Sequence, residues 1–212
     1  MQHKPQVIDK RRARGEESRR LILRSAISSI AALGLSKTTL DRVAEIAGVS
    51  RALVVFHFKS KNLLIKEVLE FLGRRYGEGW DAVVASGSTS AMDKILQLVD
   101  YDIRFACENP GYISAWHAFW GESKGNLLYQ ELGVPRDKRY ARELKDLLAT
   151  VIDEGGYDKQ ELPAIIKGLN AMLYGLWVKF HLDPEMDECD TGTTAVRLFL
   201  AKVFPNHLRY IN

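Results

Sequence analysis

The sequence predicts an all-α protein in which a small three-helix head precedes a larger helical domain. Apolar residues recur at helical spacing through most of the chain, no segment reads as a convincing strand, and breaks containing Gly or Pro separate the helical stretches. The chain has 212 residues, of which 46% are hydrophobic and 27% are charged, and this composition is typical of a soluble globular protein.

The first predicted helix runs from Glu16 to about Leu33, and Gly34 ends it. A segment with five Lys or Arg residues, 1–15, precedes it. We expect this segment to be a flexible basic arm. The arm is either a solvated tail or a contact to DNA phosphates or the minor groove.

Residues 38–58 predict two short helices joined by a tight turn. Thr38 and Thr39 are candidate caps of the first helix, because a hydroxyl oxygen accepts from the free N–H groups of a first turn. Gly48 suits the left-handed conformation that ends a helix, and Ser50 can cap the second helix. This arrangement is typical of a helix-turn-helix, although an ordinary helical hairpin inside a bundle gives a similar pattern.

The charge distribution favours DNA as the partner of this head. Residues 1–66 carry 14 Lys or Arg against 5 Asp or Glu, a net charge of +9, whereas residues 67–212 have a net charge of −6. A basic lobe suits a polyanion, but it can also serve solubility or attraction to an anionic membrane. We expect the helix 50–58 to enter a major groove, with Arg51 reading a guanine edge. The predicted DNA-binding residues are Thr38, Thr39, Ser50, Arg51, Ala52, Val55, His57, Lys59 and Lys61.

A long amphipathic helix over about residues 61–85 is expected to join the head to the second domain and to transmit motion between them. Further helices are predicted at about 90–107, 110–123, 137–154, 160–181 and 191–204. The expected domains are the arm 1–15, a DNA-binding domain 16–60, and a third domain, 61–212, for which the residues and the resemblances described below lead us to expect effector binding and dimerisation.

Aromatic residues at helical spacing are the candidate effector site. They either form a packed core or line a pocket whose ring faces attract a cation, such as a choline-like amine. The candidates are Tyr112, Trp116, Phe119, Trp120, Tyr174, Trp177 and His181. For dimerisation, small and apolar residues on the last two long helices would allow close contact with a second copy, and these are Gly168, Ala171, Gly175, Leu198, Phe199 and Ala201.

Catalytic and metal-binding motifs are missing from the sequence. It has no GxSxG, P-loop, GxGxxG or HExxH motif, and its five histidines lack paired metal spacing. We therefore predict no enzyme, no cofactor and no metal. Cys107 and Cys189 lie far apart in sequence, so we expect no disulfide framework and a reducing, cytoplasmic setting. No apolar run reaches the ~18 residues that span a membrane.

The head resembles the TetR family of bacterial repressors. The matching residues are Ile22, Ala26, Gly34, Thr38, Thr39, Ala44, Ala47, Gly48, Val49, Ser50, His57, Phe58, Lys61, Leu63 and Leu64. Val55 departs from the pattern, because the family usually has a tyrosine there. The missing phenol removes one phosphate contact that the family leads us to expect.

The second domain resembles the BetI-type subgroup of choline-responsive regulators, through the segments ENPGYISAWHAFWGES at 108–123 and YGLWVKFHLDPE at 174–185. The two resemblances imply an all-α homodimer whose last two long helices pair in a four-helix bundle. They leave the effector unidentified. We hypothesise a repressor that an effector releases from a palindromic operator; a helical adaptor or ligand-binding protein without specific DNA binding is the alternative.

Overall fold

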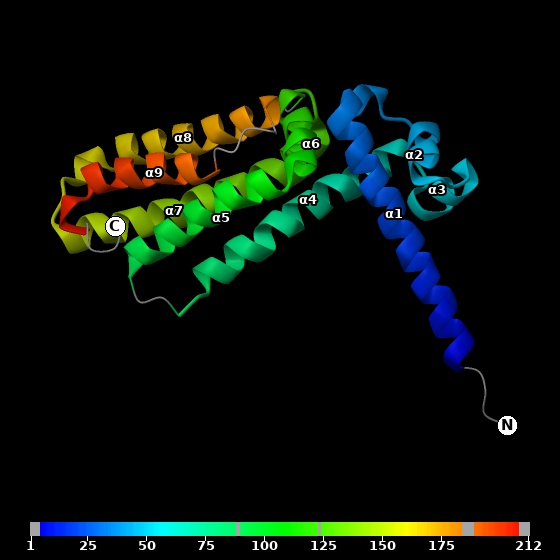
Figure 1. The fold of residues 1–212 in the computed structure, drawn as a ribbon, viewed down its shortest axis with the longest axis horizontal. Helices are drawn as coiled ribbons and strands as arrows, with labels where there is room; N and C mark the ends of the chain where they lie inside the picture. Colours follow the sequence, from blue (N-terminus) through cyan, green and yellow to red (C-terminus); the bar gives the residue numbers. More distant parts are fainter. Residues whose placement is uncertain (1–4, 88–89, 123, 184–188, 208–212) are drawn as a thin grey trace.

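The computed structural model describes residues 5–87, 90–122, 124–183 and 189–207. These residues are mostly helical and contain no strand, as predicted. Figure 1 shows a small head of α1, α2 and α3 at one end and a larger bundle at the other, with α4 running from the head into the bundle. The helices are α1 (Pro5–Lys37), α2 (Leu40–Ala47), α3 (Arg51–Phe58), α4 (Lys61–Val84), α5 (Ala91–Glu108), α6 (Pro110–Gly121), α7 (Val134–Gly155), α8 (Leu162–Leu182) and α9 (Cys189–Val203). Three shorter segments are the π-helix η1 (Tyr129–Gly133) and the 3₁₀ helices η2 (Lys159–Glu161) and η3 (Pro205–His207).

Helix α1 begins at Pro5, well before the predicted start at Glu16. The expectation of a flexible arm is therefore wrong for residues 5–15, and residues 1–4 lie outside the described part of the chain. Lys, Arg and Ala favour helices, and Arg12 contributes an ion pair to Glu16 one turn on, at 3.2 Å between Nε and Oε1. The predicted break at Gly34 is confirmed, since its φ of +80° interrupts the helical backbone.

The helix-turn-helix is capped much as its sequence indicated. The Thr39 hydroxyl accepts from the Arg42 N–H at 3.2 Å, and the Ser50 hydroxyl accepts from the Leu53 N–H at 3.2 Å. Gly48 has a φ of +64°, the left-handed conformation that a C-terminal glycine supplies without a Cβ clash. These contacts hold α2 and α3 at a defined angle against α1.

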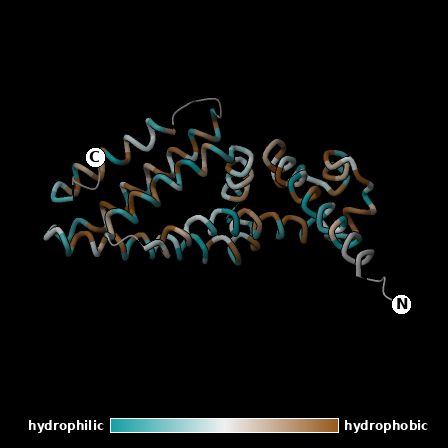
Figure 2. Tube along the Cα trace, turned by 60° about the horizontal axis from the view of Figure 1, so that its bottom comes forward, coloured by the Kyte–Doolittle hydropathy of each residue, from teal (hydrophilic) through white to brown (hydrophobic). Residues whose placement is uncertain are grey.

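The larger domain is a bundle in which α8 and α9 lie side by side (Figure 1). Hydrophobic and hydrophilic residues alternate around the coils of the helices, so each helix has an apolar side to bury (Figure 2). Helix α6 packs against α1 of the head as well as against α8, and therefore connects the two domains alongside α4. No helix of the described ranges has an apolar stretch that could cross a bilayer.

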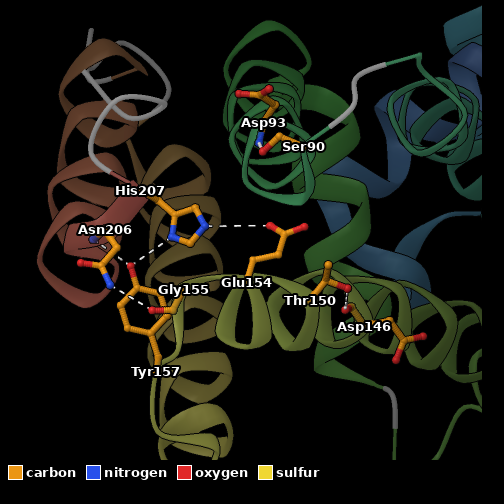
Figure 3. Close-up of polar contacts among 9 residues, drawn as sticks. All are labelled: Ser90, Asp93, Asp146, Thr150, Glu154, Gly155, Tyr157, Asn206 and His207. Carbon is orange, nitrogen blue, oxygen red and sulfur yellow. Dashed lines mark hydrogen bonds and ion pairs between the residues drawn. The ribbon is translucent and has the colours of Figure 1, made fainter.

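Side chains at the far end of the bundle fasten the end of α9 to the end of α7 (Figure 3). The Tyr157 hydroxyl accepts from the Asn206 backbone N–H at 2.8 Å and lies 3.0 Å from Nδ1 of His207. The Asn206 side-chain amide donates to the Gly155 carbonyl at 2.9 Å. This network closes the bundle at the end opposite to the head.

The two cysteines form a disulfide in this structure, contrary to the expectation of no disulfide framework. Cys107 lies near the end of α5 and Cys189 begins α9, and their Cα atoms are 6.2 Å apart. Because α5 and α9 pack together, a sequence separation of 82 residues becomes a short distance in space. Separation along the chain therefore gave no information on whether the thiols meet.

Candidate DNA-reading face and effector cavity

Helix α3 buries one side and presents the other to solvent. Val54 and Phe58 are buried against the head, whereas Arg51, Ala52 and Phe56 are exposed. Val55 is half-buried between the two sides. The exposed side is the one that is free to enter a DNA groove.

Arg51 already has a partner on this face. Its Nε lies 2.9 Å from Oδ1 of Asp41 on α2, and both side chains are more than 60% exposed. An exposed ion pair of this kind contributes at most about 1 kcal/mol, so a guanine edge or a phosphate can replace Asp41. The pair therefore positions Arg51 without withdrawing it from DNA.

The predicted DNA-binding residues at and just after the end of α3 differ in charge, exposure and hydrogen bonding. Partial burial lowers the pKa of His57, and the charges of Arg19 and Lys59 lower it further, so the imidazole is neutral near pH 7. Lys59 is exposed and has a φ of +64°, which is rare for a residue with a side chain. Lys61 Nζ donates to the Ser36 carbonyl at 2.9 Å and so ties the start of α4 to the end of α1.

Thr38 is the one predicted DNA-binding residue whose side chain is buried. It is 1% exposed, donates its hydroxyl proton to the Gly34 carbonyl at 2.9 Å, and lies 3.1 Å from the Ser29 hydroxyl. A side chain without accessible surface offers nothing to a phosphate, so we withdraw Thr38 from the predicted site. It holds the kink of α1 instead.

Sequence reasoning missed Phe56, which is 67% exposed on the outer side of α3. Its ring lies 5.4 Å from Lys59 Nζ and 5.2 Å from the His57 ring. The signal was in the helical spacing, because Phe56 falls on the opposite side from Val54 and Phe58.

The aromatic cluster of the larger domain lines a cavity of about 90 Å³, and its role as an effector site stays a prediction. Four of the seven predicted residues, Trp116, Trp120, Tyr174 and Trp177, line it. The complete lining is Tyr76, Trp80, Asp102, Trp116, Trp120, Asp137, Tyr140, Ala141, Leu144, Asn170, Leu173, Tyr174 and Trp177.

Asp102 is the chemical centre of this cavity. It is 6% exposed, and its carboxylate accepts from the Tyr76 hydroxyl at 2.7 Å and from the Trp177 indole N–H at 2.9 Å. Burial raises the pKa of Asp102 to about 6, while the two hydrogen bonds oppose that rise. Both donors are neutral, and no Lys or Arg of the described residues forms an ion pair with this carboxylate. Burying an ionised carboxylate without a positive partner costs free energy, and a cation bound in the cavity would offset that cost.

The aromatic rings beside Asp102 present both faces and edges. The rings of Trp116 and Trp177 meet edge to face with their centroids 5.7 Å apart, and Tyr76 lies 5.7 Å from Trp177. Trp116 also shows that these rings accept a cation, because the Arg136 guanidinium lies 4.5 Å from its centroid. The indole N–H of Trp116 is buried without a hydrogen-bond partner.

Three predicted effector residues lie outside the cavity lining. Tyr112 packs edge to face on Phe71 at 5.9 Å, and Phe119 is fully buried in the core. His181 lies 3.0 Å from the Ser114 hydroxyl through Nδ1 and stacks on His117 at 4.7 Å. These side chains support the walls of the cavity and have no surface inside it.

Sequence reasoning also missed the residues that α4, α5 and α7 contribute to the cavity. A signal for Asp102 existed, because it lies three residues after Val99 and three before Phe105, on the apolar side of α5. An acidic residue on an apolar helix face is costly unless it has a function or a partner. The Tyr and Trp residues of α4 and α7 gave no such signal, since they follow ordinary core spacing.

Among the predicted dimerisation residues, Ala201 is half-buried, and the other five fall into two groups. Gly168 and Phe199 face each other within one chain, because a Cβ on Gly168 would lie 3.2 Å from the Phe199 ring. Ala171, Gly175 and Leu198 are exposed. The exposed apolar stripe of α8 continues through Tyr174, Val178 and Leu182, which are 54%, 43% and 76% exposed.

The described residues contain no group of three or more His, Cys, Asp or Glu side chains that could hold a metal ion. The described residues instead place an exposed helix face that carries Arg51 at one end of the molecule and a buried carboxylate among aromatic rings at the other.

The capped helix pair and the exposed second helix define the class of the protein, a helix-turn-helix DNA-binding transcriptional regulator. The family model described as "Bacterial regulatory proteins, tetR family" matches residues 22–68, and the model described as "BetI-type transcriptional repressor, C-terminal" matches residues 91–205. The chain therefore belongs to the TetR family of transcriptional regulators and has a BetI-type C-terminal domain.

Curated relatives agree with this assignment. The chain is 25% identical over 185 residues to the HTH-type transcriptional regulator BetI of Cronobacter sakazakii, covering 86% of this chain and 88% of that protein. It is 24% identical over 172 residues to the HTH-type transcriptional regulator BetI 1 of Chromohalobacter salexigens, covering 81% and 83%.

Solved structures share the fold. A protein described as a transcriptional regulator from Pseudomonas aeruginosa superposes with a TM-score of 0.75 at 19% identity, covering 93% of this chain and 95% of that one. Another, from Saccharomonospora viridis and solved in complex with choline, gives a TM-score of 0.70 at 23% identity, covering 87% and 96%.

Proposed function

We propose that this regulator is a repressor whose effector is a small organic cation, most simply a quaternary or other alkylated amine, bound in the cavity around Asp102. The observation that carries the proposal is the Asp102 carboxylate, which is buried among aromatic rings and has only neutral donors as partners. A cation would supply the missing charge, and ring faces would stabilise its alkyl groups by about 1–2 kcal/mol each. The structural neighbour solved with choline supports this class of ligand.

The effector would act on DNA binding through α6 and α4. Trp116 and Trp120 line the cavity from α6, which packs against α1 of the head, and Tyr76 and Trp80 line it from α4. A cation that draws these rings toward Asp102 would move both helices that connect the domains. Coupling of about 1–3 kcal/mol is sufficient for a regulatory response.

A homodimer is proposed to hold two copies of α3 in successive major grooves of a palindromic operator, ~34–36 Å apart. The exposed stripe of Ala171, Gly175, Val178 and Leu182 on α8, with Leu198 on α9, supports this arrangement because monomers rarely leave such a stripe uncovered. Sedimentation at micromolar concentration tests it, and a monomer there contradicts it.

Calorimetry with choline and its neutral isostere 3,3-dimethylbutanol tests the effector class. The two molecules have nearly the same shape, so a cation site binds choline and not the alcohol. We expect choline to reduce binding of the protein to its operator in a gel-shift assay. Equal affinity for both molecules, or no binding of choline, tetramethylammonium or any alkylated amine, contradicts the proposal.

A variant pair locates the site. Trp177→Phe removes the indole donor to Asp102 while keeping an aromatic ring, and is expected to weaken choline binding. Phe71→Leu changes an aromatic residue that packs outside the cavity lining, on Tyr112, and is expected to bind choline normally. If neither variant differs from the wild type, the effector binds elsewhere.

A further inference from the structure

We propose that Phe56 is a specificity-determining residue, and that its ring contacts the C5-methyl group of a thymine in the major groove of the operator. The proposal starts from its position. Phe56 lies two residues from both Val54 and Phe58, which puts it about 200° around the helix from each of these buried side chains. The ring therefore projects from the centre of the exposed side of α3.

The exposure of Phe56 indicates that its ring contacts a binding partner. It is 67% exposed although Phe is among the residue types most often buried, and its neighbour one turn earlier, Ala52, is small and also exposed. The ring is thus the most prominent apolar group on the helix. Since α3 is the reading helix of a DNA-binding regulator, the surface that Phe56 meets in function is the floor of a groove.

The surrounding charges favour DNA over another protein or a membrane. Lys59 Nζ lies 5.4 Å from the Phe56 ring, and Arg51 is exposed on the same helix. Two copies of such a face would repel each other, and one apolar side chain is too little to anchor a helix in a membrane. A duplex offers phosphates to the cations and a recessed apolar group to the ring.

That apolar group is the thymine methyl. In the major groove, each base pair presents hydrogen-bond donors and acceptors, and only thymine adds a methyl group. A phenyl ring cannot use the polar atoms, but it can exclude water from the methyl. Val55, which replaces the tyrosine usual in the family, lacks an aromatic ring, and Phe56 places one on the adjacent position of the same helix.

Deoxyuridine substitution tests the contact directly, because uracil differs from thymine only in lacking the methyl group. An operator is first selected from a random duplex library with the purified full-length chain, and each thymine is then replaced in turn, in both half-sites. We expect one position at which the wild type binds about 4-fold more weakly for each half-site changed, the effect of losing one buried methyl.

Combining the Phe56→Ala variant with the deoxyuridine operators gives a double-mutant cycle between the side chain and the base. The variant is expected to bind the thymine operator ~10-fold or more weakly and to bind the thymine and deoxyuridine operators equally well. Phe56→Leu keeps an apolar contact and is expected to retain part of the preference. The slope of affinity against salt is expected to stay unchanged in both variants, because phosphate contacts are intact.

Leu127→Ala is the matched control, since Leu127 is 84% exposed but lies in the larger domain. It is expected to leave affinity and base preference unchanged. The proposal is overturned if no duplex is enriched, if no deoxyuridine substitution weakens binding, if Phe56→Ala binds like the wild type, or if Phe56→Ala still prefers thymine at the sensitive position.

Discussion

The head and the larger domain place their functional chemistry in opposite ways. In the head, Arg51, Phe56 and Lys59 stand on the outside of a small apolar core. In the larger domain, Asp102 lies inside, held by Tyr76 and Trp177. The nature of the two partners would explain the difference. A DNA duplex binds against the outer surface of the head, whereas a small cation of the kind proposed above can be surrounded, and burial strengthens its electrostatic contacts.

Removing the disulfide is expected to have the largest effect and to act on the larger domain alone. A link that closes a loop of about 82 residues stabilises by about 4–5 kcal/mol in the chain-entropy model. The double variant Cys107→Ser, Cys189→Ser should therefore unfold at a lower urea concentration than the oxidised wild type. The wild type in excess dithiothreitol should match the variant.

Equal urea midpoints for the oxidised wild type and the double variant would contradict this prediction. The head contains neither cysteine, so the loss of stability should be confined to the larger domain. Tryptophan fluorescence reports on that domain, because all the tryptophans lie in residues 80–177.

The second prediction is that Asp102→Asn weakens choline binding by about 2–5 kcal/mol at pH 8, because the buried positive charge loses its counter-charge. In the wild type, binding should weaken as the pH falls below about 6, the pKa to which burial raises Asp102. The sign follows because protonation removes the charge that the ligand needs. Above this pH the carboxylate is ionised and affinity should be constant.

Calorimetry between pH 5 and pH 8 measures both effects. The Asp102→Asn variant should show no pH dependence over this range. The control is Asp100→Asn, because Asp100 is a half-buried carboxylate paired with Arg197 at 2.6 Å, and this variant should keep the wild-type profile. A flat wild-type profile would remove Asp102 from the site.

The third prediction concerns the outside of the head. Arg51→Ala is expected to cost about 1–3 kcal/mol of discrimination at one base position of the operator. Arg42→Ala is the control, because Arg42 is exposed on α2 and paired with Glu45 at 2.7 Å. Competition assays against single-base operator variants measure the discrimination, and uniform weakening on every sequence would make Arg51 a phosphate contact.

The smallest expected effect is that of the helix cap at Thr39. Thr39→Ala leaves the Arg42 N–H without its acceptor and should lower the free energy of unfolding by about 1 kcal/mol. Thr39→Ser keeps the oxygen and should be close to the wild type in urea unfolding. Equal losses in the two variants would mean that packing of the methyl group, and not the cap, matters here.

The sequence predicted the helices better than it predicted the sites. Helix bounds such as Arg51–Phe58 and Lys61–Val84 follow from local spacing, caps and breaks, all of which neighbouring residues determine. The start of α1 was missed because nothing distinguishes a basic helix from a basic tail when both lack an apolar face.

Lining residues of the cavity could be predicted only where aromatic residues recur at helical spacing along a single helix. Trp116 and Trp120, one turn apart on α6, were found in this way. Tyr140 and Trp80 join them only because α7 and α4 also converge here, and no local signal reports such convergence. The same limit applies to Cys107 and Cys189, whose contact depends on the packing of α5 against α9. Asp102 differs, because an acidic residue on the apolar side of α5 is itself a local signal.

The backbone of Lys59 has a consequence for engineering this regulator. Its φ of +64° with ψ of −48° lies outside the regions that residues with a Cβ prefer, and such a conformation costs on the order of 1–3 kcal/mol. A glycine would relieve that cost but would also delete the ammonium group that lies above the Phe56 ring. Thermostable variants selected without DNA should therefore tend to lose repression through this position first.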